Sequence, residues 1–271
     1  MVSVLVDLPD LHSETPKVPF PVESVGHVGV KRFISLTQAD RPAMAVMEIT
    51  IGLRAEQRGA HMSRLIECTK TPAAPHDLRH YVKMVFDGLR RLTPTAASWR
   101  ISCRASMTVP VEGGLKPIEE ICEMYAAAKQ EPRIRWGGAF KVCLACPQAQ
   151  AVIAHDRDDL ANAFCYPSHN QLCELEILLS GSTEVASGQT VDGLLAMGEE
   201  AASGPVRELH KRRCEADVVA AVHRRALFAE DALRDITVKL RADHPDAIEV
   251  RTQIVNFESI FEYPLRCTVT G

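Results

Sequence analysis

The chain has 271 residues, of which 46% are hydrophobic and 24% charged, the balance of a globular protein with a sizeable core. Its net charge of −4 argues against nucleic-acid binding, and no apolar run approaches the roughly 20 residues that cross a bilayer. No basic stretch followed by an apolar one opens the chain, and its nine cysteines have no regular paired spacing. We therefore expect no signal peptide and a reducing, cytoplasmic compartment.

The sequence pattern in the first half of the chain predicts a loosely structured N-terminal arm, followed by two strands and two helices. The arm, residues 1–25, is rich in Pro, Ser and Glu. Alternating side chains predict strands at 28–36 and 44–55. Apolar residues at helical spacing then predict helices at 59–70 and 76–92.

The clearest strand signal lies at 98–109, where apolar and polar residues alternate without a break. Residues 118–130 are ambiguous, because their Ala and Glu content favours a helix by propensity. Strands are expected again at 134–146 and 172–179.

The second half continues with helices at 190–203 and 226–243 and a last strand at 247–259. Both halves thus run strands, two helices, strands, which favours an α+β fold of two duplicated units with antiparallel sheets. We place the units at 26–130 and 131–271.

Four residues between 143 and 169 have the spacing of a metal or redox motif. Cys143, Cys146, Cys165 and His169 read C-x2-C-x18-C-x3-H. This spacing is compatible with a closed structural zinc site or a catalytic metal site. Buried core cysteines explain it equally well, and a redox pair is disfavoured because no βαβ pattern surrounds it.

Six short motifs along the chain carry more information than this spacing alone. They are GAHMSRLIE at 59–67, CP at 146–147, SHNQ at 168–171, KRRCE at 211–215, LFAEDALRD at 227–235 and NFESI at 256–260. In this order they resemble the GTP cyclohydrolase type IB family, including its archaeal methanopterin-pathway relatives. The resemblance implies tandem tunnelling-fold (T-fold) units, each an antiparallel sheet with two helices on one side. It also implies a strand at 118–130 and a homotetramer with active sites at subunit interfaces.

The resemblance further implies a catalytic metal held by Cys146, His169 and Glu215. Thiolate, imidazole and carboxylate suit Zn²⁺, and also Fe²⁺ or Mn²⁺, and three ligands leave a position for water. Cys143 and Cys165 are then buried neighbours. The implied reaction is attack of metal-bound water on C8 of GTP, release of formate, and closure towards 7,8-dihydroneopterin triphosphate.

Further residues are implied in binding GTP. Glu230 matches the family glutamate that holds the purine. The triphosphate is expected to meet the cluster His61, Ser63 and Arg64, together with Lys211.

Glu258 can be argued without the family. In a regular strand it shares one face with Ile248, Val250, Ile254 and Asn256. A carboxylate on an otherwise apolar face is costly unless it is paired or functional, so we predict a catalytic role. The alternative is that the strand has ended or bulged at this residue.

The sequence departs from the family pattern at Gln148, Leu172 and Phe261. Phe261 stands where the family has a histidine that can move a proton. His155, in the longer segment 151–167, could replace it, although we expect this histidine to face solvent. Two alternatives to the full reaction therefore stay open. One is a diverged enzyme that stops at a ring-opened formamidopyrimidine or acts on another purine nucleotide, and the other is a non-catalytic oligomer that binds a purine or pterin.

Overall fold

A computed structural model of the chain describes residues 10–37, 40–70, 75–112, 114–160 and 165–271. It forms two compact units, the first of Met1–Cys103 with Glu123–Arg133 and the second of Arg104–Cys122 with Ile134–Gly271. The expected division near residue 130 lies close to Arg133, but the second unit also takes part of two earlier strands, which contribute to both units.

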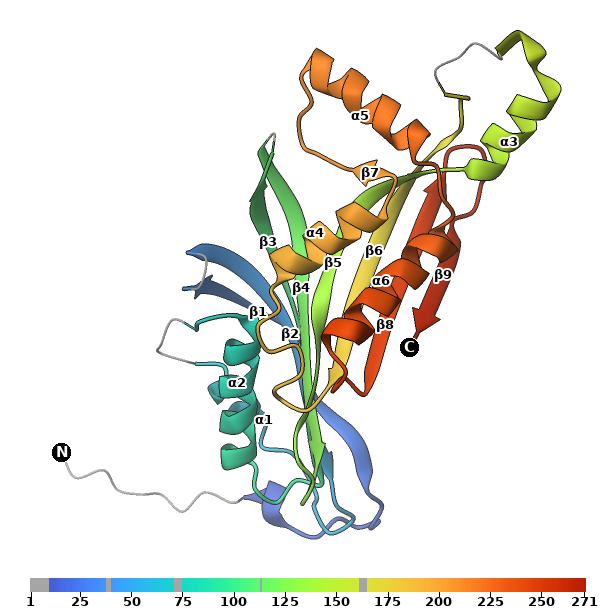
Figure 1. Ribbon diagram of the computed structural model, residues 1–271. Coiled ribbons are helices and arrows are strands. Elements are labelled where there is room, and N and C mark those ends of the chain that lie inside the picture. Colours follow the sequence, from blue (N-terminus) through green and yellow to red (C-terminus); the bar gives the residue numbers. More distant parts are fainter. Residues whose placement is uncertain (1–9, 38–39, 71–74, 113, 161–164) are drawn as a thin grey trace. The chain divides into compact units, whose positions relative to one another are not determined.

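The first unit begins with a long antiparallel hairpin (Figure 1). Strand β1, Val22–Leu36, pairs with β2, Arg41–Leu53, so the last residues of the predicted arm are already strand. A short 3₁₀ helix, Leu11–Ser13, precedes them. Helices α1, Met62–Glu67, and α2, Leu78–Leu92, follow, as predicted.

Strands β3, Ser98–Val111, and β4, Gly114–Ala127, are shared by the two units. The alternation predicted for β3 is confirmed, because Trp99 and the five apolar residues that alternate after it are buried. Strand β4 confirms the strand expected from the family resemblance. Tertiary burial of side chains such as Met124 there overrides the local helix propensity.

In the second unit the strands are ordered β3-β4-β5-β6-β8-β9. Strand β5 is Arg133–Ala145, β6 is Asn170–Gly181, β8 is Glu249–Glu258 and β9 is Leu265–Thr270. Neighbouring strands from β5 to β9 are antiparallel, and the two-residue β7, Gly204–Pro205, also pairs with β5. The predicted α+β class with an antiparallel sheet is confirmed.

Helices α4, Val191–Ala201, and α6, Ala229–Asp243, cover one face of this sheet (Figure 1). Helix α4 approaches the strands closely at Gly198, where an added Cβ would lie 2.5 Å from a ring carbon of Phe140. Apolar side chains of α6 such as Leu233, Ile236 and Leu240 are fully buried. Burial of these side chains supplies the core of the second unit.

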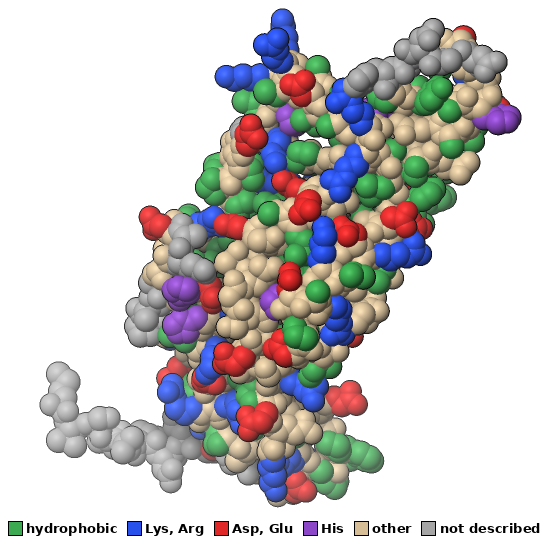
Figure 2. All heavy atoms as spheres, in the orientation of Figure 1, with side chains coloured by type: hydrophobic (Ala, Val, Ile, Leu, Met, Phe, Trp, Pro, Cys, Tyr) green, Lys and Arg blue, Asp and Glu red, His purple; other side chains and the backbone are tan. Residues whose placement is uncertain are grey.

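Two further helices of this unit have almost no buried residues and were not predicted. Helix α3, Pro147–Asp156, buries none of its side chains, and a 3₁₀ turn at Asp158–Leu160 follows it. Helix α5, Arg212–Arg224, buries only Val222. Figure 2 shows acidic and basic side chains interspersed on the visible surface. Within the described ranges, every helix is too short or too polar to cross a bilayer.

Candidate active site

The ends of three strands, β5, β6 and β8, lie side by side at one end of the sheet in the second unit. We call this end of the sheet the site edge. The last pair of the β5–β6 ladder is Ala145 with Asn170, and the last pair of the β6–β8 ladder is Gln171 with Glu258. Cys146 directly follows Ala145, and His169 directly precedes Asn170. The register therefore places Cys146, His169 and Glu258, three residues predicted for the site, at the same edge.

Cys146 joins β5 to α3 and begins that helix. Its Sγ accepts a hydrogen bond from the Ala149 backbone N–H at 3.4 Å, and Pro147 occupies the first helical turn. Proline favours this position because its missing N–H would have no intrahelical partner there. The Ser168 hydroxyl donates to the Cys146 carbonyl oxygen at 2.8 Å, which fastens the two chain segments that carry Cys146 and His169.

His169 carries an unsatisfied polar atom. Its Nδ1 is buried and has no hydrogen-bond partner among the described residues. A buried polar atom without a partner is costly, and such atoms in native proteins point to a missing ion, water or ligand. A thiol and an imidazole at one sheet edge are donors that fit a divalent transition metal.

Glu215 does not join these two donors. It lies in the exposed first turn of α5, whereas the end of that helix approaches the site through His223, whose Nε2 is 3.3 Å from the Ser168 carbonyl oxygen. Glu215 lies eight positions before His223 in the helix, about 12 Å along the axis. Over the described ranges, no three His, Cys, Asp or Glu side chains are close enough to hold a metal. The predicted ligand set therefore stays a prediction.

Two residues that sequence reasoning missed hold this edge together. Gln150 of α3 donates from Nε2 to the carbonyl oxygens of Tyr166, at 2.8 Å, and of His223, at 2.7 Å. His223 is the second, with Nδ1 2.9 Å from the Val219 carbonyl oxygen as well as its contact to Ser168. Their partners are backbone atoms, so no side-chain pattern in the sequence could have revealed them.

Glu258 is paired, which is one of the two outcomes that its position on the strand allows. Its Oε1 accepts hydrogen bonds from the side-chain amides of Gln171, at 3.2 Å, and Asn256, at 3.1 Å. Burial, with smaller contributions from Cys143 and Glu258, raises the pKa of the neighbouring Cys173 thiol to about 12. Strand β8 thus stays regular to its end, and a carboxylate is held in a polar cluster at the edge.

The predicted face of β8 is correct except at one residue. Val250, Thr252, Ile254 and Asn256 are buried, but Ile248 is 58% exposed because the strand begins one residue later, at Glu249.

Glu230 lies in the first turn of α6. The segment before this helix is bonded to the site edge, because the Leu227 N–H donates to the Ala145 carbonyl oxygen at 3.1 Å. On its other side Glu230 is close to β9, where burial is the main cause and Glu230 a further cause of the raised pKa of Cys267. The predicted purine-binding glutamate is therefore half-buried, in the helix that follows the segment bonded to Ala145.

The residues expected at the triphosphate lie in separate elements. His61 caps α1 in the first unit, and Ser63 and Arg64 stand in the same short helix. Burial, followed by the charge of Arg64, lowers the pKa of His61. Lys211 is the N-cap residue of α5 in the second unit.

Three other residues weighed in the sequence are also described. Cys143 and Cys165 are half-buried free thiols. His155 has an 87% exposed side chain beside Asp156, as expected for a solvent-facing histidine. Residues 161–164, which belong to the same segment, lie outside the described residues.

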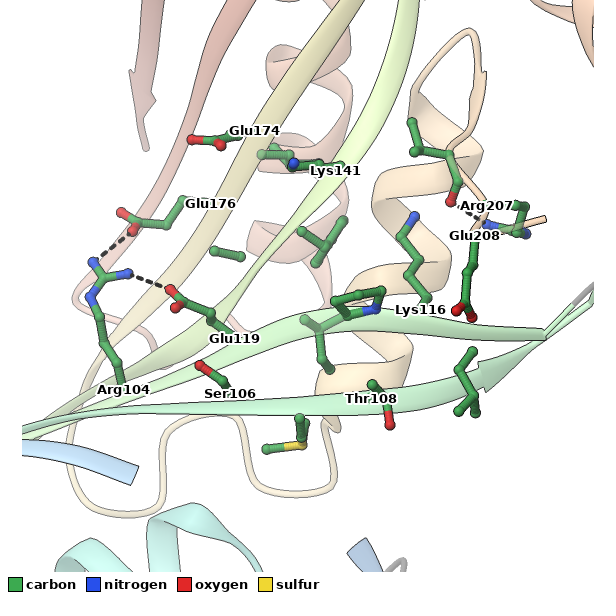
Figure 3. Close-up of a pocket in the computed structure, with 18 of the residues that line it drawn as sticks. Arg104, Ser106, Thr108, Lys116, Glu119, Lys141, Glu174, Glu176, Arg207 and Glu208 are labelled. Atoms are coloured by element: carbon green, nitrogen blue, oxygen red, sulfur yellow. Dashed lines mark hydrogen bonds and ion pairs between the residues drawn. The ribbon is translucent and has the colours of Figure 1, made fainter. Parts of the chain in front are cut away.

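A cavity of about 710 Å³ lies elsewhere in the second unit, on β3 to β6, β8 and the segment after β7 (Figure 3). None of the residues predicted for the active site lines it.

Comparison with known proteins identifies the family. The sequence model described as GCHY-1, type I GTP cyclohydrolase folE2, matches residues 8–265. GTP cyclohydrolase FolE2 2 of Cupriavidus metallidurans is 29% identical, over 94% of this chain and 92% of that protein. GTP cyclohydrolase FolE2 of Bordetella pertussis is 26% identical, over 97% of this chain and 96% of that protein.

Solved structures of urate oxidases share the fold. Uricase from Arthrobacter globiformis matches 92% of this chain and 93% of its own, with a TM-score of 0.56 and 9% identity. A mutant urate oxidase from Bacillus sp. TB-90 matches 92% of this chain and 100% of its own, with a TM-score of 0.58 and 9% identity. These likenesses confirm the tunnelling-fold class. With the family match over almost the whole sequence, they lead to one conclusion: the chain belongs to the type I GTP cyclohydrolase FolE2 family, hydrolases that act on GTP.

Proposed function

We propose that this protein opens the imidazole ring of GTP by hydrolysis at C8, releases formate and forms 7,8-dihydroneopterin triphosphate. The observation that carries the proposal is the sheet edge where Cys146 and the unsatisfied Nδ1 of His169 adjoin the cluster around Glu258. This edge combines metal-ligating and acid–base groups in a chain of the matching family.

The metal would be held by Cys146 and His169, with Glu215 as the third ligand once α5 brings it to the edge. A divalent ion such as Zn²⁺, Fe²⁺ or Mn²⁺ supplies Lewis acidity and lowers the pKa of water. The protein is expected to act as a homotetramer, which would allow another subunit to complete each site.

The remaining roles fall to side chains of this chain. Glu230 accepts hydrogen bonds from the guanine N–H groups and fixes the base. Arg64 and Lys211 neutralise charge on the triphosphate, and His61 and Ser63 donate hydrogen bonds to it. Glu258, held at Oε1 by Gln171 and Asn256, takes or returns a proton during ring opening.

One observation favours a second candidate, an enzyme that stops at the ring-opened formamidopyrimidine. Strand β8 ends at Glu258, and Phe261 and Tyr263 follow it in the chain. These two residues are 64% and 77% exposed. Phe261 cannot transfer a proton where the family has a histidine, and the later steps need proton transfers.

One experiment separates these functions. Purified protein is loaded anaerobically with Zn²⁺, Fe²⁺ or Mn²⁺ and incubated with GTP, and the products are analysed by mass spectrometry. Neopterin after oxidation and dephosphorylation supports the full reaction. A formamidopyrimidine, which keeps C8 as its formyl group, without neopterin supports the truncated one. Binding of GTP without any product would refute both.

A further inference from the structure

The cavity of about 710 Å³ in the second unit is separate from the proposed active site and has charged walls. Its volume lies in the range of small-molecule pockets. Figure 3 shows Lys116 of β4 and Arg207, which follows β7, at one end of it, and Arg104 with Glu119 and Glu176 at the other.

Two acidic residues at the second end, Glu119 and Glu176, are neutralised within the protein. Arg104 forms ion pairs with Glu119 and with Glu176, each at 3.2 Å. Arg251 pairs with Glu176 as well, at 3.4 Å. These charges therefore contribute little net field to the cavity.

At the first end of the cavity, the side chains of Lys116 and Arg207 both bind the carboxylate of Glu199. Lys116 Nζ donates to Glu199 Oε1 at 2.5 Å, and Arg207 holds both carboxylate oxygens through Nη1 and Nη2, the latter at 2.8 Å. The side chains of Lys116 and Arg207 are 3% and 14% exposed. Among the described residues, Glu199 is the acid that both cations contact, so the cluster keeps one positive charge in a poorly hydrated position.

An uncompensated charge away from water is unfavourable, and a bound anion would remove the cost. The contacts of Arg207 with the described residues use Nη1 and Nη2, which leaves its Nε–H as a further donor. Lys116 uses one of three ammonium protons on Glu199, and burial lowers its pKa despite the bond to this carboxylate. Donors and charge are thus both available where the cavity meets the cluster.

We propose that Arg207 and Lys116 bind the oxyanion group, phosphate or carboxylate, of a small molecule that occupies this cavity. Guanidinium and ammonium groups are the side chains that recognise such groups by charge-assisted hydrogen bonds. This site is distinct from the residues assigned to the triphosphate of GTP. Glu208 lines the same cavity and opposes an anion, so it sets a limit on affinity.

Isothermal titration of the full chain at low ionic strength tests the proposal, with pyrophosphate and malonate as separate probes. Arg207→Gln leaves Lys116 and Glu199 as a neutral pair and is expected to weaken binding by about tenfold or more. Glu208→Gln, the matched control in the same cavity, should bind as tightly as the wild type or more tightly. Which probe binds better distinguishes a phosphate from a carboxylate ligand.

Two further variants guard against misfolding of Arg207→Gln and against binding of the probe elsewhere in the protein. Lys116→Met replaces Arg207→Gln if the latter fails to fold. Lys211→Gln removes the cation expected at the triphosphate of GTP, because pyrophosphate could bind there as well. The proposal is overturned if neither probe binds the wild type, if Arg207→Gln binds like the wild type, or if only Lys211→Gln loses binding.

Discussion

Gln171 and Glu258 stand directly opposite each other in the β6–β8 ladder, and the glutamine amide donates to Glu258 Oε1 at 3.2 Å. Asn256 donates to the same oxygen. Among the described residues, both amide donors engage one carboxylate oxygen of Glu258. The arrangement fixes the orientation of this carboxylate next to the strand ends that carry Cys146 and His169.

Replacing Glu258 by Gln should lower GTP turnover by about 10²-fold or more, because the amide cannot accept a proton. The protein should stay folded, since an amide of the same size can still accept from Gln171 and Asn256. Formate release is the readout. Glu249→Gln, at the opposite end of β8, is the control and should keep wild-type turnover. Equal turnover in Glu258→Gln and wild type would remove this residue from the mechanism.

Metal content should depend on the edge residues. Cys146→Ser and His169→Ala should each lose most of the bound metal, measured by equilibrium dialysis with elemental analysis, because each removes a ligand. Cobalt-substituted protein should also lose its thiolate charge-transfer band in Cys146→Ser. If Cys165→Ser releases the metal and Glu215→Gln does not, the ion belongs to a closed structural site instead.

Phe261→His tests whether a missing imidazole limits the reaction. A histidine restores a group that can move a proton, so neopterin formation from GTP should rise by about tenfold or more. Phe261→Leu, which also lacks a group that can move a proton, is the control and should change it little. An unchanged product pattern in Phe261→His would assign proton transfer to another residue.

Two substitutions in α6, one at a buried and one at an exposed position, should differ in their effect on the free energy of unfolding. Leu240 is fully buried, and Leu240→Ala should lower the free energy of unfolding by about 2–5 kcal/mol through lost burial and a cavity. Val238, in the same helix, is 69% exposed, and Val238→Ala should change it by less than about 0.5 kcal/mol. Urea denaturation measures both. Similar losses in the two variants would contradict the packing of this helix.

The loss of folding stability at low pH should depend on the ionisation of Glu199. Burial opposes its ionisation, but the hydrogen bonds from Arg207 and Lys116 outweigh burial and lower the pKa below its ordinary value of 4.5. A carboxylate with a lowered folded-state pKa contributes stability above its unfolded value, and this is lost as the pH falls through the folded value. Stability should therefore decline below about pH 4.5. Glu199→Gln should show a shallower decline in urea titrations between pH 5 and pH 3, and an unchanged slope would exclude this residue as the cause.

The strands with regular alternation could be predicted from the sequence, because one buried face leaves a clear pattern. Strand β3 is the best example. Strand β4 needed the family resemblance, since its Ala and Glu residues favour a helix locally. Helices α3 and α5 bury at most one residue, so no apolar periodicity marks them.

The residue types of the proposed site could be named from the sequence, but its geometry only in part. Cys146 and His169 are 23 positions apart in sequence, and the β5–β6 register alone brings them together. The place of Glu215 depends on the orientation of α5, which local sequence does not determine.

Because the Ala149 N–H donates a hydrogen bond to Cys146 Sγ, the exchange rate of this amide depends on the chemical state of the thiol. Alkylation of the sulfur adds bulk at the start of α3 and leaves only a weak thioether acceptor, so the first turn of the helix loses its cap. Hydrogen–deuterium exchange at the Ala149 amide should therefore accelerate when the thiol is modified, so the chemical state of one sulfur atom can be followed without any assay of turnover.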